Sequence, residues 1–371
     1  MGKSRMFLSL LKLGIGTMKA SDEDCQKLLQ LSMQEWRDVM TLAERQGVLA
    51  IAIDGLQTLM EAHKGEIIAV KEEPANWQMW LLENIGQLTQ YEMMNHQQKK
   101  VIAKLSEIWA AEGIRMMVFK GQANAALYPK PEHRALGDID CWLFGDAEKG
   151  DEIAKAHGAD VSFDWYRHSK IAYKGETIEN HRVMSHTRGS EKKQKMEGEL
   201  RLMVQGEGLM VIDGCGKALM SSPQFNACFL TYHGLHHFTS EGLRMKQILD
   251  WAVFLQKEQN KVDWPQCNDF CKRYKLDRFA AVMNSIASEY LGVQLNSSDI
   301  KVDGTFAEKI MQSTLYDDDY LFNSGKSNWT VRWLLVKNML TRDKWKYRDI
   351  AQLNVWMQLW QNGMGFISNK D

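Results

Sequence analysis

Residues 113–144 read GIRMMVFKGQANAALYPKPEHRALGDIDCWLF, and this stretch decides the fold. Its first apolar run, 114–119, is short and predicts a buried strand. A glycine turn and a short helix over 122–127 are expected next, because helix-tolerant residues continue until two prolines stop them. A second apolar run over 136–144 predicts another strand. The stretch therefore predicts a strand, a turn with a helix, and a second strand.

The second predicted strand carries two carboxylates, Asp138 and Asp140. Strand side chains alternate between faces, so both carboxylates point to the same side of the sheet. Two such groups repel each other and are costly in a dry core. A bound divalent cation would make the pair favourable, and the pattern therefore predicts a metal site. A bare Asp-x-Asp pair also occurs by chance on surface strands, which leaves that interpretation open.

The residues around the glycine turn suit a phosphate group. The turn at Lys120-Gly121 opens a helix, so the free backbone N–H groups of Gly121 and Gln122 face the same end of the sheet. Lys120 and Arg134 add positive charge of the kind that binds polyphosphates. The turn, the helix and the aspartate strand together predict a site for a nucleoside triphosphate and Mg²⁺.

A set of short motifs carries a resemblance to a known family: Lys120-Gly121, Tyr128-Pro129, Arg134 and Asp138-Ile139-Asp140. Together they resemble a bacterial nucleotidyltransferase family within the DNA polymerase β-like superfamily. The usual Gly-Gly or Gly-Ser turn of the superfamily is replaced by Lys-Gly-Gln, which is the form this narrower family shows. The resemblance implies transfer of a nucleotidyl group from an NTP such as ATP to an unknown acceptor. It also implies two Mg²⁺ ions, or Mn²⁺ in their place, held by Asp138 and Asp140.

Three strand-like segments follow, at 161–167, 169–173 and 176–184, and the last two are joined as a hairpin. Within the third, Glu179 and His181 lie on one face. The resemblance implies that Glu179 is the third metal ligand and a catalytic base, with His181 beside it at the nucleotide. A solvated outer face of an edge strand remains the alternative for both residues.

Helical spacing dominates the rest of the chain, and the predicted fold class is α+β. A small mixed β-sheet core at 113–215 lies between an N-terminal helical region, 1–112, and a C-terminal helical region, 216–371. The apolar run at 6–13 predicts a peripheral helix rather than a signal peptide. The charged stretch 188–199 has no apolar period and predicts a solvated loop.

Composition limits the partners. The chain has 371 residues, 44% hydrophobic and 25% charged, which is typical of a soluble globular protein. Its formal net charge of −1 gives no bulk attraction to nucleic acid or membrane, so a small-molecule or protein acceptor is expected rather than long nucleic acid. The six cysteines show no disulfide or zinc spacing, and no stretch is apolar enough to span a bilayer. These features predict a cytoplasmic protein.

Several patterns leave alternatives open. His233, His236 and His237 have metal-like spacing, but their apolar neighbours favour interior histidines, with a role near the active site still possible in principle. His168 is expected to be a surface-loop histidine. An acidic run at 317–319 is expected to be a solvated turn, and the aromatic tail 345–366 a helix. The altered glycine turn supports a second function, a catalytically inactive nucleotidyltransferase-like protein that binds or regulates a partner.

Overall fold

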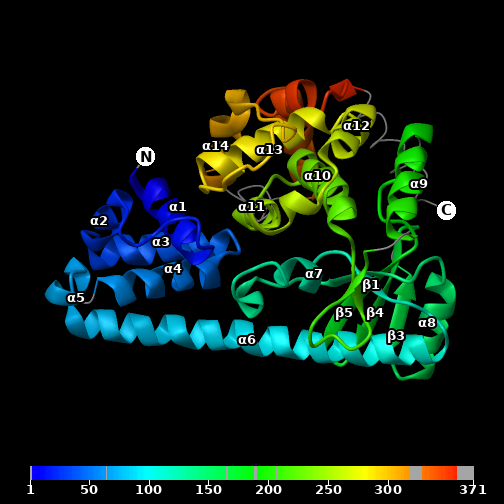
Figure 1. Cartoon of the computed structure of the whole chain (residues 1–371), viewed down its shortest axis with the longest axis horizontal. Coiled ribbons are helices and arrows are strands. Elements are labelled where there is room, and N and C mark those ends of the chain that lie inside the picture. The colour runs from blue at the N-terminus through cyan, green and yellow to red at the C-terminus, as the bar shows by residue number, and fades with distance from the viewer. Residues whose placement is uncertain are drawn as a thin grey trace.

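The computed structural model describes residues 2–63, 65–163, 166–187, 190–205, 208–316 and 328–356. Within this part of the chain, helices surround one seven-stranded mixed sheet, so the predicted α+β class is confirmed. The sheet lies at one end of the molecule and the N-terminal helices at the other (Figure 1). The acidic run 317–319 and residues 357–366 of the aromatic tail lie outside the described residues.

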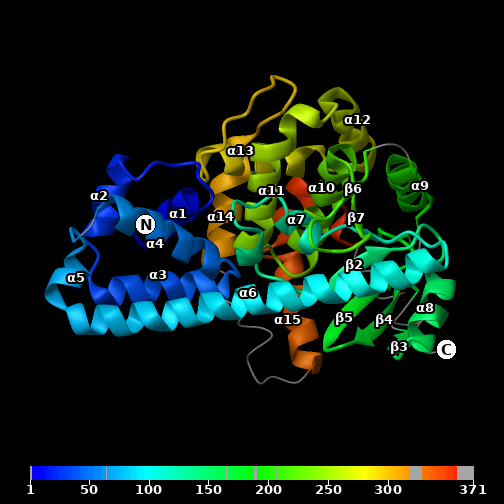
Figure 2. The same cartoon turned by 60° about the horizontal axis from the view of Figure 1, so that its bottom comes forward.

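The N-terminal region is helical, as predicted, with these elements: α1 (Gly2–Gly14), α2 (Glu23–Leu29), α3 (Met33–Arg45), α4 (Leu49–Ala62), α5 (Ile68–Glu72) and α6 (Pro74–Ala111). The long helix α6 begins with proline at its first position, where the missing N–H costs nothing. In two views it runs from the N-terminal helices to α8 (Ala147–Ala156) beside the sheet (Figure 1, Figure 2). It therefore connects the two ends of the molecule.

Helix α1 is not peripheral, so that prediction was wrong. Phe7, Leu10 and Leu11 are fully buried, and the helix packs along α4. The contact is close because two glycines bring the backbones together. A Cβ on Gly14 would lie 2.1 Å from the carbonyl oxygen of Ile51, and a Cβ on Gly55 would lie 2.1 Å from that of Leu10.

We expect Gly55→Ala to lower the free energy of unfolding by about 1–3 kcal/mol, because the new methyl group must push α1 and α4 apart. Gly86→Ala in α6 is the matched control, since its Cβ meets open space. That control should raise stability by about 0.5–1 kcal/mol through helix propensity. Urea unfolding of both variants measures the difference, and equal midpoints would contradict the close packing.

The central region contains the sheet and the short helices that join it: β1 (Met117–Val118), α7 (Gln122–Ala125), η1 (Pro131–His133), β2 (Ile139–Trp142), α8, β3 (Asp160–Phe163), β4 (His168–Tyr173), β5 (Glu176–His181), β6 (Met210–Val211) and β7 (Leu219–Met220). The strand order is β3-β4-β5-β2-β1-β7-β6. Strand β2 pairs antiparallel with β1 and parallel with β5. The predicted strands and hairpin are confirmed, although four of the five strands are shorter than predicted and β4 begins one residue earlier.

The stretch predicted as a solvated loop is instead largely helical, forming α9 (Glu191–Gln205). Met196, Leu200 and Val204 recur at every fourth position and are buried. This apolar stripe begins only after a turn of charged residues, which hid the period at the start of the stretch. A helix, rather than open solvent, therefore lies beside the segment that follows β5, where Glu197 of α9 accepts the backbone N–H groups of Met184 and Ser185.

The C-terminal region is again helical: α10 (Pro223–Ser240), α11 (Met245–Glu258), η2 (Gln259–Lys261), α12 (Trp264–Tyr274), α13 (Asp277–Glu289), η3 (Gly304–Phe306), α14 (Ala307–Tyr316), α15 (Asn328–Leu340) and a π-helical turn, η4 (Lys346–Ile350). Ser222 caps α10 by accepting the N–H of Phe225, as its position before Pro223 predicts. One buried hydrophobic cluster includes residues from all three predicted regions, so their boundaries stay a prediction. No helix in the described part of the chain is long and apolar enough to cross a membrane.

Candidate functional site

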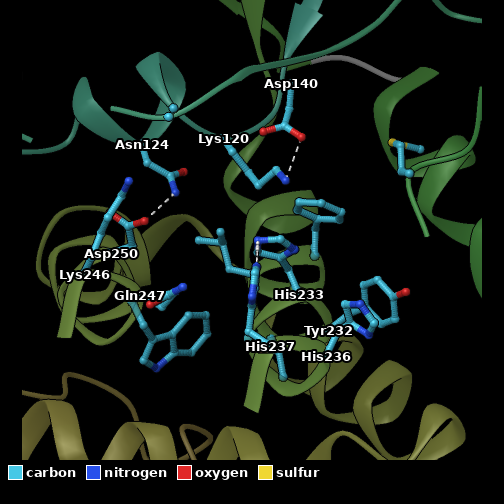
Figure 3. Close-up of a pocket in the computed structure, with 18 of the residues that line it drawn as sticks. Lys120, Asn124, Asp140, Tyr232, His233, His236, His237, Lys246, Gln247 and Asp250 are labelled. Atoms are coloured by element: carbon cyan, nitrogen blue, oxygen red, sulfur yellow. Dashed lines mark hydrogen bonds and ion pairs between the residues drawn. The ribbon is translucent and has the colours of Figure 1, made fainter. Parts of the chain in front are cut away.

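A cavity of about 500 Å³ lies between one end of the sheet and helices α10 and α11 (Figure 3). The sequence-predicted residues that line it are Lys120, Gly121, Arg134, Asp138, Asp140 and Glu179. The cavity is therefore built by the central motif and closed by helices that come a hundred positions later in the chain. Of the remaining predicted residues, His181 lies behind Asp140, and Gln122 is described below.

Sheet register brings the three carboxylates together. In the parallel pairing of β2 with β5, Asp140 lies opposite Glu179. Asp138 precedes β2 and is exposed, whereas Asp140 is buried. Partial burial, together with the charges of Glu179 and Asp140, raises the pKa of Asp138 above its ordinary value. This end of the cavity therefore carries an excess of negative charge, because the three carboxylates repel one another.

Asp140 is compensated by two neighbours. The Nζ atom of Lys120 lies 2.7 Å from its Oδ1, and Nε2 of His181 lies 3.0 Å from the same oxygen. Burial opposes ionisation of Asp140, but the Lys120 charge and the His181 hydrogen bond outweigh it and hold its pKa well below the usual range. Asp140 is therefore ionised, and Lys120 supplies its counter-charge.

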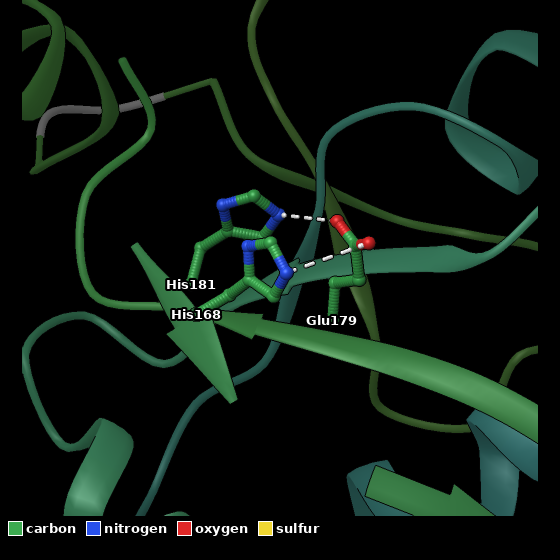
Figure 4. Close-up of side chains that lie close together, drawn as sticks. All are labelled: His168, Glu179 and His181. Carbon is green, nitrogen blue, oxygen red and sulfur yellow. Dashed lines mark ion pairs between the residues drawn. The ribbon is translucent and has the colours of Figure 1, made fainter. Parts of the chain in front are cut away.

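His168 was wrongly expected on a surface loop, because it begins β4 and its ring lies beside that of His181. Both imidazoles face Glu179 from the same side (Figure 4). The Glu179 carboxylate is 3.6 Å from Nε2 of His168 and 3.3 Å from Nε2 of His181. The ligand atoms of these three side chains all lie within 4.8 Å of one another. The predicted hairpin contained the signal for this cluster. A two-residue turn at 174–175 pairs residues equally distant from it, and so places His168 opposite His181.

Both ring nitrogens of His181 face oxygen atoms that accept hydrogen bonds. Its Nδ1 faces the carbonyl oxygen of Val183 at 3.2 Å, while its Nε2 faces both Asp140 and Glu179. A neutral imidazole carries only one N–H, so it can satisfy one of these two sides. The oxygen atoms on the other side are left without a donor from this ring, and a bound cation would compensate them. Carboxylate oxygens with neighbouring imidazole nitrogens suit divalent cations, and imidazole favours Mn²⁺ or Zn²⁺ over Mg²⁺.

Arg134 lines the cavity, but its charge is already paired. Its Nε and one terminal nitrogen each donate to Asp250 of α11 at 2.7 Å. The same carboxylate accepts from Tyr128 Oη at 2.8 Å and from Asn124 Nδ2 at 3.1 Å. Burial opposes ionisation of Asp250, yet the Arg134 charge outweighs it and lowers its pKa. No role in the site was predicted for Asp250, because its partner Arg134 lies 116 positions away in the chain.

The side chain of Gln122 points away from the cavity. It is buried, and its Nε2 faces Asn95 Oδ1 at 3.2 Å and Gln98 Oε1 at 3.4 Å, both in α6. Only its backbone N–H is left to serve the predicted role. Lys246, which sequence reasoning missed, lines the cavity near Asn124 (Figure 3). Burial and then the charge of Arg134 lower its pKa to about 8.

The three histidines of α10 are half-buried and line the cavity wall. Nε2 of His233 lies 3.1 Å from Nε2 of His237, and the His233 ring stacks on Phe229. Burial, followed by the charge of Lys120, lowers the pKa of His233 well below its ordinary value. Burial and His237 likewise lower the pKa of His236 to about 4. These rings are therefore neutral donors or acceptors at neutral pH, as interior histidines are expected to be.

The family described as "Uncharacterised nucleotidyltransferase" matches residues 32–292. The chain belongs to this family. The match covers every predicted site residue, together with Lys246 and Asp250, and it confirms the resemblance seen in the sequence. Comparison with curated proteins and with solved structures gave no match. The bacterial origin and the wider superfamily stay predictions.

The two aspartates of the central motif should have opposite effects on stability when metal is removed. In EDTA, Asp138→Asn should raise the free energy of unfolding by up to about 1 kcal/mol, because it removes a repelled and partly screened charge. Asp140→Asn should lower it by about 3 kcal/mol, because Lys120 and His181 lose their buried partner. Urea unfolding at pH 7 measures both.

The pH dependence checks the cause. The folded-state pKa of Asp138 is raised, so its neutral form is favoured in the folded protein. The gain from Asp138→Asn should therefore shrink as the pH falls through that pKa, where Asp138 becomes neutral by itself. Destabilisation by both substitutions, or a gain that persists unchanged at acidic pH, would contradict this distribution of charge.

Proposed function

We propose that the protein transfers a nucleotidyl group from an NTP, with ATP as the first candidate, to an acceptor bound in the same cavity. One observation carries the proposal: Asp138, Asp140 and Glu179 meet at one end of the cavity, with Lys120 as the counter-charge. This agrees with the family to which the chain belongs.

The three carboxylates would hold two Mg²⁺ ions or Mn²⁺. Their geometry fits, because they share one sheet end and carry a charge excess that a divalent cation would relieve. When bound, such ions supply charge neutralisation at the triphosphate and lower the pKa of an attacking hydroxyl. His168 and His181 lie close enough to Glu179 to favour Mn²⁺ over Mg²⁺.

The triphosphate would lie along the glycine turn. Lys120 would leave Asp140 for the phosphates once other cations neutralise that carboxylate, and Gly121 and Gln122 would offer backbone N–H groups. Arg134 would add its field while remaining bound to Asp250. Lys246 extends this positive side of the cavity and would reach the same phosphates.

The transfer step uses Glu179 as the base. An acceptor hydroxyl oxygen forms a bond to the α-phosphorus, the bond from that phosphorus to the pyrophosphate oxygen breaks, and pyrophosphate leaves. The hydroxyl proton passes to Glu179. The hydrogen bond from His181 lowers the pKa of Glu179, so its carboxylate is ionised at neutral pH and available to accept the proton.

A small molecule or a protein side chain fits this cavity better than long nucleic acid, since the chain as a whole is close to neutral. We also place the protein in the cytoplasm as part of the proposal. A second candidate, a catalytically inactive nucleotide-binding or regulatory protein, is favoured by one observation. The charges of both Lys120 and Arg134 are already paired within the protein.

Thermal unfolding with each of the four NTPs, with and without Mg²⁺ or Mn²⁺, tests the proposal. At an NTP concentration of 100 times Kd we expect a stabilisation of about 2.7 kcal/mol that requires the metal. The double variant Asp138→Asn/Asp140→Asn should lose the shift. Asp160→Asn, an exposed aspartate in β3 of the same sheet, is the matched control and should keep it.

Pyrophosphate release separates the two candidates. We expect wild type to bind NTP with metal and to release pyrophosphate in the presence of acceptors from a cell extract. The Glu179→Gln variant should release none. Metal-dependent binding without any release would instead support the inactive protein. If no NTP shifts the thermal unfolding of wild type, with or without metal, the result contradicts nucleotide binding and with it both candidate functions.

A further inference from the structure

The side of the cavity away from the glycine turn has its own chemistry. Figure 3 places Tyr232 and His236 on the side opposite Lys246. Arg167 and His186 also line this region. We call Arg167, His186 and His236 the arginine subsite. It adjoins the carboxylates, because Arg167 directly precedes His168, whose Nε2 is 3.6 Å from Glu179.

Arg167 is held in place without an acidic partner. Its Nη1 lies 2.8 Å from Nε2 of His186, and its backbone carbonyl accepts the N–H of Arg182 at 2.7 Å. Its buried Nε has no hydrogen-bond partner among the described residues. Within that part of the chain, no carboxylate forms an ion pair with Arg167. A buried donor and a positive charge are thus left for a ligand to satisfy.

The two histidines form a fixed wall around this charge. The His186 and His236 rings lie with their centroids 4.3 Å apart, and His236 stacks on Tyr232. The Tyr232 hydroxyl accepts the backbone N–H of His186 at 2.8 Å, which ties the loop to α10. The subsite is therefore built from three separate segments that hold one another in position.

The lowered pKa values of His186 and His236 agree with an excess of positive charge around these rings. Burial, and then the charge of Arg167, lowers the pKa of His186 to about 2. The pKa of His236, already low through burial, is pushed further down by His237 and by Arg167. Lys193 of α9 contributes in the same direction to both rings. Neutral imidazoles beside an unpaired guanidinium are suited to an anion rather than to another cation.

We propose that the arginine subsite binds an anionic group of the acceptor, a phosphate or a carboxylate, and thereby presents the acceptor's hydroxyl to Glu179. The acceptor role rests on the proposed nucleotidyl transfer, whereas anion binding at Arg167 does not. A planar guanidinium pairs with either oxyanion through two parallel hydrogen bonds. A neutral acceptor would leave the buried Nε of Arg167 unsatisfied, at a cost in binding.

The cavity then has two sides, one proposed for the triphosphate and one for the acceptor. The glycine turn, Asn124 and Lys246 form the side proposed for the triphosphate, and the arginine subsite forms the opposite side. Asp140 lies between the two sides in Figure 3, so an α-phosphorus and an acceptor hydroxyl would approach it from different sides. This is the arrangement that direct displacement of pyrophosphate requires, with the entering and leaving oxygens in line.

The test uses inorganic phosphate and acetate as probes, without nucleotide or metal. Calorimetric titration compares wild type with Arg167→Gln and with Lys155→Gln, a change at an exposed lysine of α8 that does not line the cavity. We expect a phosphate or acetate site in wild type that is at least about 10-fold weaker in Arg167→Gln, by loss of a charge-assisted pair. Lys155→Gln is the matched control and should keep that site. The probe that binds more tightly identifies the group.

Arg167→Lys keeps the proposal testable should Arg167→Gln fold poorly. It retains the charge but loses the two-pronged geometry, so it should bind the anion more weakly than wild type and more tightly than Arg167→Gln. Titrations of both Arg167 variants that coincide with wild type would overturn the subsite, and so would absence of binding by both probes. Anion binding at Arg167, together with no thermal shift from any of the four NTPs, would support the subsite and contradict nucleotidyl transfer.

Discussion

The buried ion pair between Arg134 and Asp250 is the contact on which the cavity depends. It joins the loop before β2 to helix α11 across 116 positions of the chain. Because Tyr128 and Asn124 also donate to Asp250, the glycine-turn helix and the proline turn are tied to the same carboxylate. A buried charge that loses its partner is strongly destabilising, so this contact fixes α11 as one wall of the site. The site exists only when both halves of the chain have docked.

A second constraint is the unequal treatment of three neighbouring carboxylates. Asp140 is buried and bound by Lys120 and His181, Glu179 faces two neighbouring imidazoles, and Asp138 is left exposed with a raised pKa. Lys120 is therefore the counter-charge of Asp140, and under the proposed function other cations would replace it there. The neutral histidines of α10 close the cavity without adding a competing charge at neutral pH. The distribution suits a site that receives both an anion and a cation.

Local patterns predicted much of this. Asp138 and Asp140 both line the cavity, the hairpin follows from its two-residue turn, and the helical flanks follow from their apolar period. The failures have physical causes. Burial of α1 depends on Gly14 and Gly55 meeting a helix that the sequence does not identify as a partner. The pairing of Arg134 with Asp250 is a long-range contact, and no local period encodes it. Helix α9 was missed because charges precede its apolar stripe.

The most direct measurement is a crystal structure with Mn²⁺ and an ATP analogue that cannot be cleaved at the α-phosphorus. We expect anomalous density for Mn²⁺ among Asp138, Asp140 and Glu179, with the triphosphate along Gly121. We also expect the Nζ atom of Lys120 to leave Asp140, now 2.7 Å away, for a phosphate oxygen. Lys120 still bound to Asp140, with Mn²⁺ or the nucleotide located elsewhere, would contradict nucleotidyl transfer at these carboxylates.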